Sequence, residues 1–267
     1  MVMIDYHLHT SRCCHATGTL QEYLAEAEKK NLLEIGFADH FPLDLLGHTP
    51  RVQVTMHGDE LEEYIEQVEE LKKASGNPQV KLGIEIDYIP GTEARLAKLL
   101  AQYDFDYIIG SIHFMGSWDF THPVYADVYR EKDISGLYNA YFKLVWDACR
   151  CGLFDIIGHI DVIKKFGYRP AENLESLWIK TAGLLKESGT CLELNTAGQD
   201  APVGDFYPDR RLLEICCSEG VSITLGSDAH GPDQVGRHFA EAVGLLKDIG
   251  YRELTVFDRR IRNSMPF

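Results

Sequence analysis

Short apolar runs alternate with longer amphipathic segments along most of the chain. The apolar runs predict buried parallel strands at 2–6, 33–38, 80–87, 106–112, 155–159, 190–195 and 221–226, with a weaker eighth at 254–257. The amphipathic segments predict helices at 19–30, 58–74, 92–102, 134–151, 171–188, 209–219 and 234–248. In the second helix, Leu61, Ile65, Val68 and Leu71 fall on one stripe with charges elsewhere. We therefore expect an α/β fold.

The repeated order of strand then helix predicts a parallel sheet with right-handed crossovers. Seven or eight such units favour closure of the sheet into a barrel. The alternative is an open, doubly wound sheet, which typically carries a glycine-rich loop after its first strand; here that loop holds histidines instead. No linker or change in composition marks a boundary, so we expect a single domain over residues 1–267.

Polar residues with metal-binding chemistry follow the predicted strands or end them. They are His7, His9, His40, Glu85, His113, His159, Asp228 and His230, joined by His15 in the first loop. In a parallel barrel the carboxyl ends of the strands converge on one face, where active sites are built. We therefore expect these seven histidines and two carboxylates to meet at one rim.

The spacing of these residues suits metal ions. His7 and His9 are two apart in an extended segment, so both side chains leave the same face, and Asp228 and His230 repeat this relation. Imidazole and carboxylate bind zinc, iron and manganese, and nine such donors suit two or three ions rather than one. Each histidine alone could be an ordinary hydrogen-bonded residue, but burying the whole set without metal would be costly.

The charge balance narrows the class of partner. A formal net charge of −15 without a basic stretch argues against nucleic acid or an anionic membrane as a partner. An anionic substrate would need a local reversal of this field, which bound cations provide. The seven cysteines lack CxxC spacing and suggest a reduced protein; Cys13 and Cys14 are not expected to be ligands. No signal peptide or membrane-spanning run is evident, so a cytoplasmic location is expected.

Several motifs resemble those of the polymerase-and-histidinol-phosphatase (PHP) superfamily. They are DYHLHT with CCHA, FADH, GIEIDYIPG, GSIHFMGSWDF, GHIDVIKKFGY, ELNTAG and LGSDAH. IDYIPG, GSIHF and KKFGYRP are closer to its monofunctional histidinol-phosphate phosphatases. The resemblance implies a distorted (β/α)7 TIM-like barrel with three divalent ions drawn from zinc, iron and manganese. It assigns His7, His9, Glu85 and Asp228 to the first ion, Glu85, His113 and His159 to the second, and His15, His40 and His230 to the third.

Such a cluster is suited to hydrolysis of a phosphate monoester. Two neighbouring ions lower the pKa of a shared water, giving a metal-bridging hydroxide that attacks phosphorus. We expect Glu85, Asp228 and His40 as catalytic residues and Lys164, Arg12 and Arg237 as substrate contacts. Asp5, Asp39 and Asp161 are candidates to orient the ligand histidines from behind.

The expected reaction is hydrolysis of L-histidinol phosphate to L-histidinol and phosphate in histidine biosynthesis. Three alternatives remain. They are a phosphoesterase of the same superfamily acting on another small ester or a nucleotide, an amidohydrolase-like enzyme, and a non-catalytic metal-binding module. Amidohydrolases typically bridge their metals with a lysine, whereas here Glu85 takes that place, and the full ligand set argues against a non-catalytic module.

Overall fold

The computed structural model describes residues 3–267 and is built around a seven-stranded parallel sheet. Its strands, in spatial order, are β1 (Ile4–Leu8), β2 (Glu34–Phe37), β3 (Gln79–Asp87), β4 (Tyr107–Ser111), β7 (Ile156–Ile157), β8 (Cys191–Asn195) and β9 (Ile223–Gly226). Almost every residue in these strands is buried, as expected for a parallel sheet covered on both faces.

The first and last strands of the sheet, β1 and β9, approach each other just past their carboxyl ends. The amide of His9 donates to the carbonyl of Ala229 (3.0 Å), and the amide of Ala229 donates to the carbonyl of His7 (3.1 Å). These bonds join the carboxyl ends of β1 and β9, so the sheet is a nearly closed barrel. This confirms the predicted distorted seven-stranded barrel.

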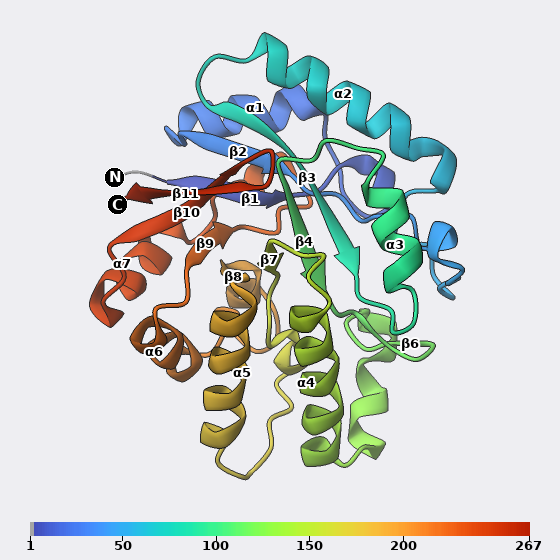
Figure 1. Ribbon diagram of the computed structural model, residues 1–267, viewed down its shortest axis with the longest axis vertical. Coiled ribbons are helices and arrows are strands. Elements are labelled where there is room, and N and C mark those ends of the chain that lie inside the picture. The colour runs from blue at the N-terminus through green and yellow to red at the C-terminus, as the bar shows by residue number, and fades with distance from the viewer. Residues whose placement is uncertain (1–2) are drawn as a thin grey trace.

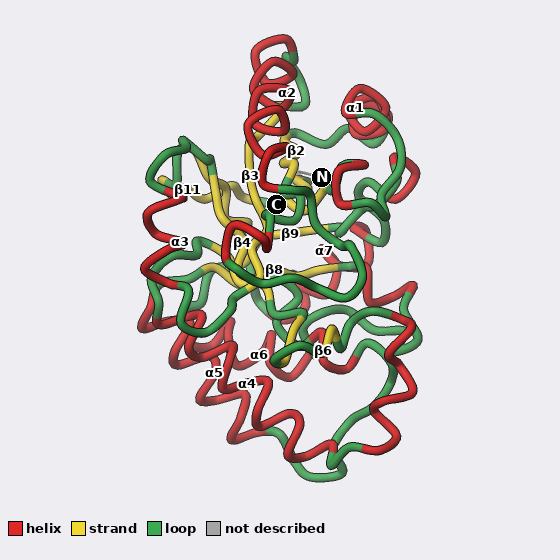
Figure 2. Tube along the Cα trace, turned by 90° about the vertical axis from the view of Figure 1, so that its right-hand side faces the viewer, coloured by secondary structure: helices red, strands yellow, loops and turns green. Residues whose placement is uncertain are grey.

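Seven helices surround the sheet (Figures 1 and 2). They are α1 (Leu20–Lys29), α2 (Leu61–Ala74), α3 (Glu93–Leu100), α4 (Ile134–Arg150), α5 (Glu175–Ser188), α6 (Arg210–Glu219) and α7 (Phe239–Ile249). A capping box between Thr19 and Glu22 begins α1. Helix α2 buries Leu61, Tyr64, Val68 and Leu71, which is the predicted stripe with Tyr64 more deeply buried than Ile65. No helix of the described chain is long and apolar enough to span a bilayer.

Three predicted elements need correction. The apolar run at 254–257 does form a strand, β10 (Glu253–Asp258), but it pairs antiparallel with β11 (Ile261–Pro266) and adds no eighth barrel strand. Helix α5 begins at Glu175 rather than 171, and α7 at Phe239 rather than 234. The predicted first strand began at residue 2, which lies outside the described residues. A short hairpin, β5 (Phe114–Met115) with β6 (Trp118–Asp119), was not predicted.

Candidate metal centre

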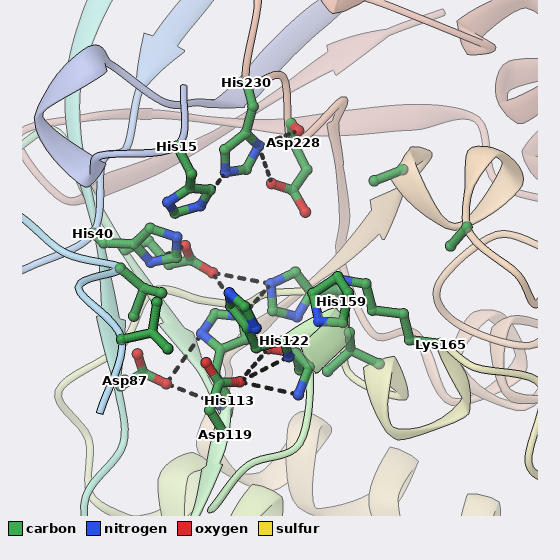
Figure 3. A pocket seen from close by; sticks show the side chains of 18 of the residues that line it. His15, His40, Asp87, His113, Asp119, His122, His159, Lys165, Asp228 and His230 are labelled. Carbon is green, nitrogen blue, oxygen red and sulfur yellow. Dashed lines mark hydrogen bonds and ion pairs between the residues drawn. The ribbon is translucent and has the colours of Figure 1, made fainter. Parts of the chain in front are cut away.

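All nine predicted ligands lie at the carboxyl ends of the barrel strands. His7 and Glu85 are in β1 and β3, and the others follow strands or lie in the first loop. Seven of them, His15, His40, Glu85, His113, His159, Asp228 and His230, line one cavity of about 650 Å³ (Figure 3). His7 and His9 lie buried among them. Residues up to 223 positions apart in the chain therefore share one site, as the strand order predicts.

Glu85 occupies the middle of the cluster and is only 1% exposed. Its Oε2 lies 3.4 Å from His7 Nε2, 3.7 Å from His9 Nε2 and 3.0 Å from His40 Nδ1, and its Oε1 lies 2.9 Å from His159 Nε2 and 3.8 Å from His113 Nε2. Burial alone would raise the pKa of Glu85, but the facing histidines hold it well below its ordinary value. One ionised carboxylate facing five imidazoles is a donor set that would hold divalent cations.

The histidines point pairs of ring nitrogens at each other. His113 Nε2 lies 3.2 Å from His159 Nε2, and His15 Nε2 lies 2.9 Å from His230 Nε2. Zinc binds imidazole nitrogen at about 2.0–2.1 Å, which places two ligands of one tetrahedral ion about 3.3 Å apart. Both pairs are close to the spacing required of ligands to a shared ion.

Oxygens of the protein contact the Nδ1 atoms of four histidines, on the side of each ring that faces away from the centre of the cluster. These contacts set which ring nitrogen faces the centre. His7 Nδ1 contacts Glu193 Oε1 (2.6 Å) and His113 Nδ1 contacts Asp87 Oδ1 (3.1 Å). His15 and His230 use backbone carbonyls in the same way, at 2.7 and 3.0 Å. Metal-bound imidazoles generally donate their second N–H to such acceptors. The arrangement leaves Nε2 of each ring free for a cation.

Several atoms of the cluster are buried without a hydrogen-bond partner among residues 3–267. They include His7 Nε2, His9 Nε2 and Glu85 Oε2, whose short contacts with one another and with neighbouring side chains lack hydrogen-bond geometry. Leaving polar atoms unsatisfied in the interior costs free energy that a bound cation would offset. The residues present therefore fit divalent metal ions.

Against the effect of burial, neighbouring carboxylates raise the pKa of His7, His9 and His113, whereas the pKa shifts of the two carboxylates and of the outer histidine favour ligation. Burial alone would raise the pKa of Asp228, but His7, His9 and His230 hold it well below its ordinary value. Burial, together with the charges of His40 and His9, lowers the pKa of His15 to about 4. Ionised carboxylates and a neutral outer imidazole are the forms that bind metal.

Two of the predicted ligands occupy backbone conformations that L-residues rarely adopt. His159 has φ of 21° and Asp228 has φ of 53°. Such strain persists only where surrounding contacts hold it and is frequent at functional sites. Glu193 Oε2 accepts from the amide of His159 (2.7 Å), and Arg237 donates to the carbonyls of Ser227 (3.0 Å) and Asp228 (3.1 Å).

The three predicted substrate contacts lie in different places. Arg237 lines the cavity, with its guanidinium also bound to Asp200 (3.2 Å). Arg12 pairs with Glu63 (3.1 Å) and lies in a separate depression beside α1 and α2. Lys164 is 1% exposed and pairs with Asp161 at 2.9 Å. The predictions for Arg12 and Lys164 are therefore not supported, because their charges are directed to carboxylates away from the cavity.

Lys165, the neighbour of Lys164, does line the cavity. Its Nζ forms no ion pair or hydrogen bond with any residue from 3 to 267, and burial lowers its pKa. Two adjacent lysines at the end of a 3-10 turn (Val162–Lys164) point in different directions, and the sequence alone does not show which one faces inward.

One of the three predicted orienting residues lies beside a ring nitrogen of a predicted ligand. Asp39 Oδ1 lies 3.5 Å from His9 Nδ1. Asp5 instead accepts from the amides of Ser227 and Gly236, and Asp161 pairs with Lys164. Glu193 and Asp87 instead lie against Nδ1 of His7 and His113. Both could have been found in the sequence as charged residues inside apolar strands, in CLELN and GIEID.

Cys13 lies closer to the cluster than the sequence suggested. Its Sγ is within 4.8 Å of ligand atoms of His15 and His230, and it donates to the carbonyl of Thr10 at 3.2 Å. The thiol is fully buried. Cys14 is exposed at the mouth of the cavity.

The chain is similar in sequence and in fold to several known proteins. A "Probable histidinol-phosphatase" of Deinococcus radiodurans is 39% identical over 261 residues, covering 97% of this chain and 98% of the relative. The histidinol-phosphatase of Bacillus subtilis is 28% identical over 254 residues, covering 87% and 95%. The fold matches the crystal structure of a histidinol phosphate phosphatase from Lactococcus lactis, in complex with Zn, L-histidinol and phosphate, with a TM-score of 0.83 at 20% identity over 98% of both chains.

A family model also matches this sequence. Residues 5–197 match the model of the PHP domain, a span that contains seven of the nine predicted ligands. The remaining two, Asp228 and His230, lie beyond the matched span but in the same cavity. The match covers more than half of the chain, and the Deinococcus radiodurans relative is similar over nearly all of it. This chain belongs to the PHP domain family.

Proposed function

We propose that this protein hydrolyses L-histidinol phosphate to L-histidinol and phosphate, in a reaction that depends on divalent metal ions. The observation that carries the proposal is Glu85, one buried carboxylate facing five imidazoles at the base of an open cavity. Similarity to relatives named histidinol-phosphatase along nearly the whole chain supports the substrate. The enzyme is accordingly a phosphoric monoester hydrolase that would act in histidine biosynthesis.

We propose three ions, drawn from zinc, iron and manganese. His7, His9, Glu85 and Asp228 would hold the first ion. Glu85, His113 and His159 would hold the second, and His15, His40 and His230 the third. When bound, such ions supply a water nucleophile at neutral pH and neutralise charge on the phosphoryl group.

The chain's own residues would position the reaction. Glu85 would hold neighbouring cations at a fixed separation, and Asp228, at the edge of the cavity, would add a second negative ligand. His40 reaches the cavity while its Nδ1 lies 3.0 Å from Glu85. Lys165 would bind a phosphoryl oxygen through its unpaired ammonium group, which is the role predicted for Lys164. Arg237 would hold the strained loop that presents Asp228.

Two wider features belong to the same proposal. One hydrophobic core runs from Ile4 to Phe257, which supports a single domain. The substrate would be a small molecule rather than nucleic acid, since the net charge of −15 opposes a polyanion. A cytoplasmic location stays a prediction of the sequence.

The test is phosphate release from L-histidinol phosphate, a nucleoside monophosphate and phenyl phosphate, with metal analysis of the same sample. We expect kcat/KM for histidinol phosphate to exceed the others by about 100-fold or more, and His9→Asn to lose both metal and activity. His57→Asn is the matched control, because His57 is exposed and outside the cavity. Equal low rates on all three esters would contradict the assigned substrate.

A further inference from the structure

The cavity has a second wall formed by the loop after β4. In Figure 3, Asp119 lies below His113, at the opposite end of the view from His15 and His230. Asp119 ends the short strand β6, lines the cavity and is only 7% exposed. A buried carboxylate in this position needs a partner or a function.

One oxygen of Asp119 is fully used by its own turn. Oδ1 accepts from the amide of Thr121 (3.0 Å), the hydroxyl of Thr121 (2.9 Å) and the amide of His122 (3.0 Å). Among residues 3–267, Oδ2 forms no hydrogen bond or ion pair. The turn therefore fixes the orientation of the carboxylate through one oxygen and leaves the other available.

The other carboxylates of the cavity already have partners. Asp87 binds the amide and ring of His113, at 2.9 and 3.1 Å. Asp200 pairs with Arg237 and His238, and Glu85 and Asp228 belong to the metal cluster. Within the described cavity wall, Asp119 is the negative charge that remains for a ligand.

The cavity also holds charges of opposite sign, because Lys165 and Asp119 both line it. The metal cluster and Lys165 favour a phosphoryl group, whereas Asp119 repels one and attracts a cation. A phosphate ester with an ammonium group in its alcohol portion would match both. L-Histidinol phosphate has this pattern, with its amine on the carbon next to the ester CH2.

We propose that Asp119 is a specificity residue that binds the ammonium group of the substrate's alcohol portion through Oδ2. The inference rests on the proposed function and adds the residue that recognises the leaving alcohol. An ester without the cation would leave Oδ2 of Asp119 without a cationic partner, and would be disfavoured for that reason.

The test compares Asp119→Asn with the unaltered enzyme on three substrates: L-histidinol phosphate, its analogue without the amine, and phenyl phosphate. The asparagine oxygen can still accept the three turn hydrogen bonds, so the loop should keep its shape. We expect kcat/KM for histidinol phosphate to fall about 30- to 300-fold, mainly through KM, with changes under about threefold on the other two esters.

Asp127→Asn is the matched control, because Asp127 lies in the following segment but is 84% exposed and pairs with the exposed Arg130. Metal content should be the same in all three proteins. An equal loss on all esters, or an unchanged preference for histidinol phosphate, would overturn the role of Asp119 and leave the proposed function standing. An unaltered enzyme that prefers phenyl phosphate would instead overturn the proposed function, and this inference with it.

Discussion

The ring nitrogens of the cluster divide into two roles. Nδ1 of His7, His113, His15 and His230 faces an oxygen of the protein, and Nε2 faces the interior of the site. The partners differ in kind, because two are carboxylates and two are backbone carbonyls. A carboxylate partner also makes the imidazole a stronger donor to metal. Glu193 and Asp87 should therefore contribute to metal affinity although neither is a predicted ligand.

Replacing Glu193 tests this. Glu193→Gln should weaken metal binding by about 10- to 100-fold, because His7 loses its charged partner and the amide of His159 loses a strong acceptor. Metal retained after dialysis against graded chelator concentrations measures the effect. Glu187→Gln, on the exposed face of α5, is the control and should retain metal normally. Equal retention in both variants would rule out the orienting role.

Lys165 should make substrate binding weaker at alkaline pH. Burial lowers the pKa of its ammonium group, and the nearby charges of Asp228 and Asp119 only partly oppose this effect. A lysine with a lowered pKa loses its proton earlier as pH rises, so its bond to phosphate should weaken with increasing pH. KM should therefore rise on the alkaline side of the profile.

Two substitutions separate this effect from other titrations. Lys165→Arg should shift the alkaline rise in KM to higher pH, since arginine stays charged. Lys165→Met should raise KM about 10- to 100-fold at neutral pH and remove the alkaline rise. The measurement is KM and kcat from pH 7 to 10. The same alkaline rise in Lys165→Met would show that another group causes it.

The elements of the barrel have different tasks at their two ends. At the carboxyl ends the strands present the predicted metal ligands, whereas at the amino ends they are held by structural contacts. Asp106, just before β4, is fully buried and accepts from the amide of Leu82 (2.8 Å), Lys72 Nζ (2.6 Å) and the amide of Arg259 (3.2 Å). One side chain thus joins β3, α2 and the turn between β10 and β11.

Removing this side chain should affect stability and not chemistry. Asp106→Ala should lower the free energy of unfolding by about 3 kcal/mol, because three donors lose a buried charged acceptor. Urea unfolding measures the loss, and the folded fraction should keep its metal content. Asp104→Ala, two residues away and exposed, should change stability by less than about 0.5 kcal/mol. A similar small change in Asp106→Ala would contradict the structural role.

The alternation of strands and helices could be predicted from the sequence, because buried parallel strands are short and apolar and the helices carry one apolar stripe. The run at 254–257 shows the limit of that signal. It has the composition of a buried strand, but its partner is β11, whose residues are almost all exposed. Composition reports burial, whereas the partner of a strand depends on contacts distant in sequence.

For the whole molecule, metal ions should contribute to stability as well as to catalysis. Metal ions bind the folded chain, in which the donor residues at the strand ends are brought together, and not the unfolded chain. A metal at 100 times its dissociation constant adds about 2.7 kcal/mol to the free energy of unfolding. Treatment with chelator should therefore lower Tm by several degrees, together with loss of phosphate release.

Restoring zinc or manganese to the chelated protein should recover both properties. Calorimetry and phosphate release on the same samples make the comparison. Magnesium is the control, because a cluster rich in imidazole favours transition ions over a cation that prefers oxygen ligands. Full activity after complete removal of transition ions would contradict the proposed mechanism.

The residue pattern predicted a barrel, with an open doubly wound sheet as the alternative, and nine metal-binding side chains that meet at one rim. These follow from local periodicity and from the rule that parallel strands end on the same face. The folded structure shows that Lys165 and not Lys164 faces the cavity and that Glu193 and Asp87 lie behind the histidines. It also shows that Asp119 has one oxygen without a partner among residues 3–267. The physical reason is that a side chain's direction and its partners depend on turns and on segments far away in sequence, which local pattern does not encode.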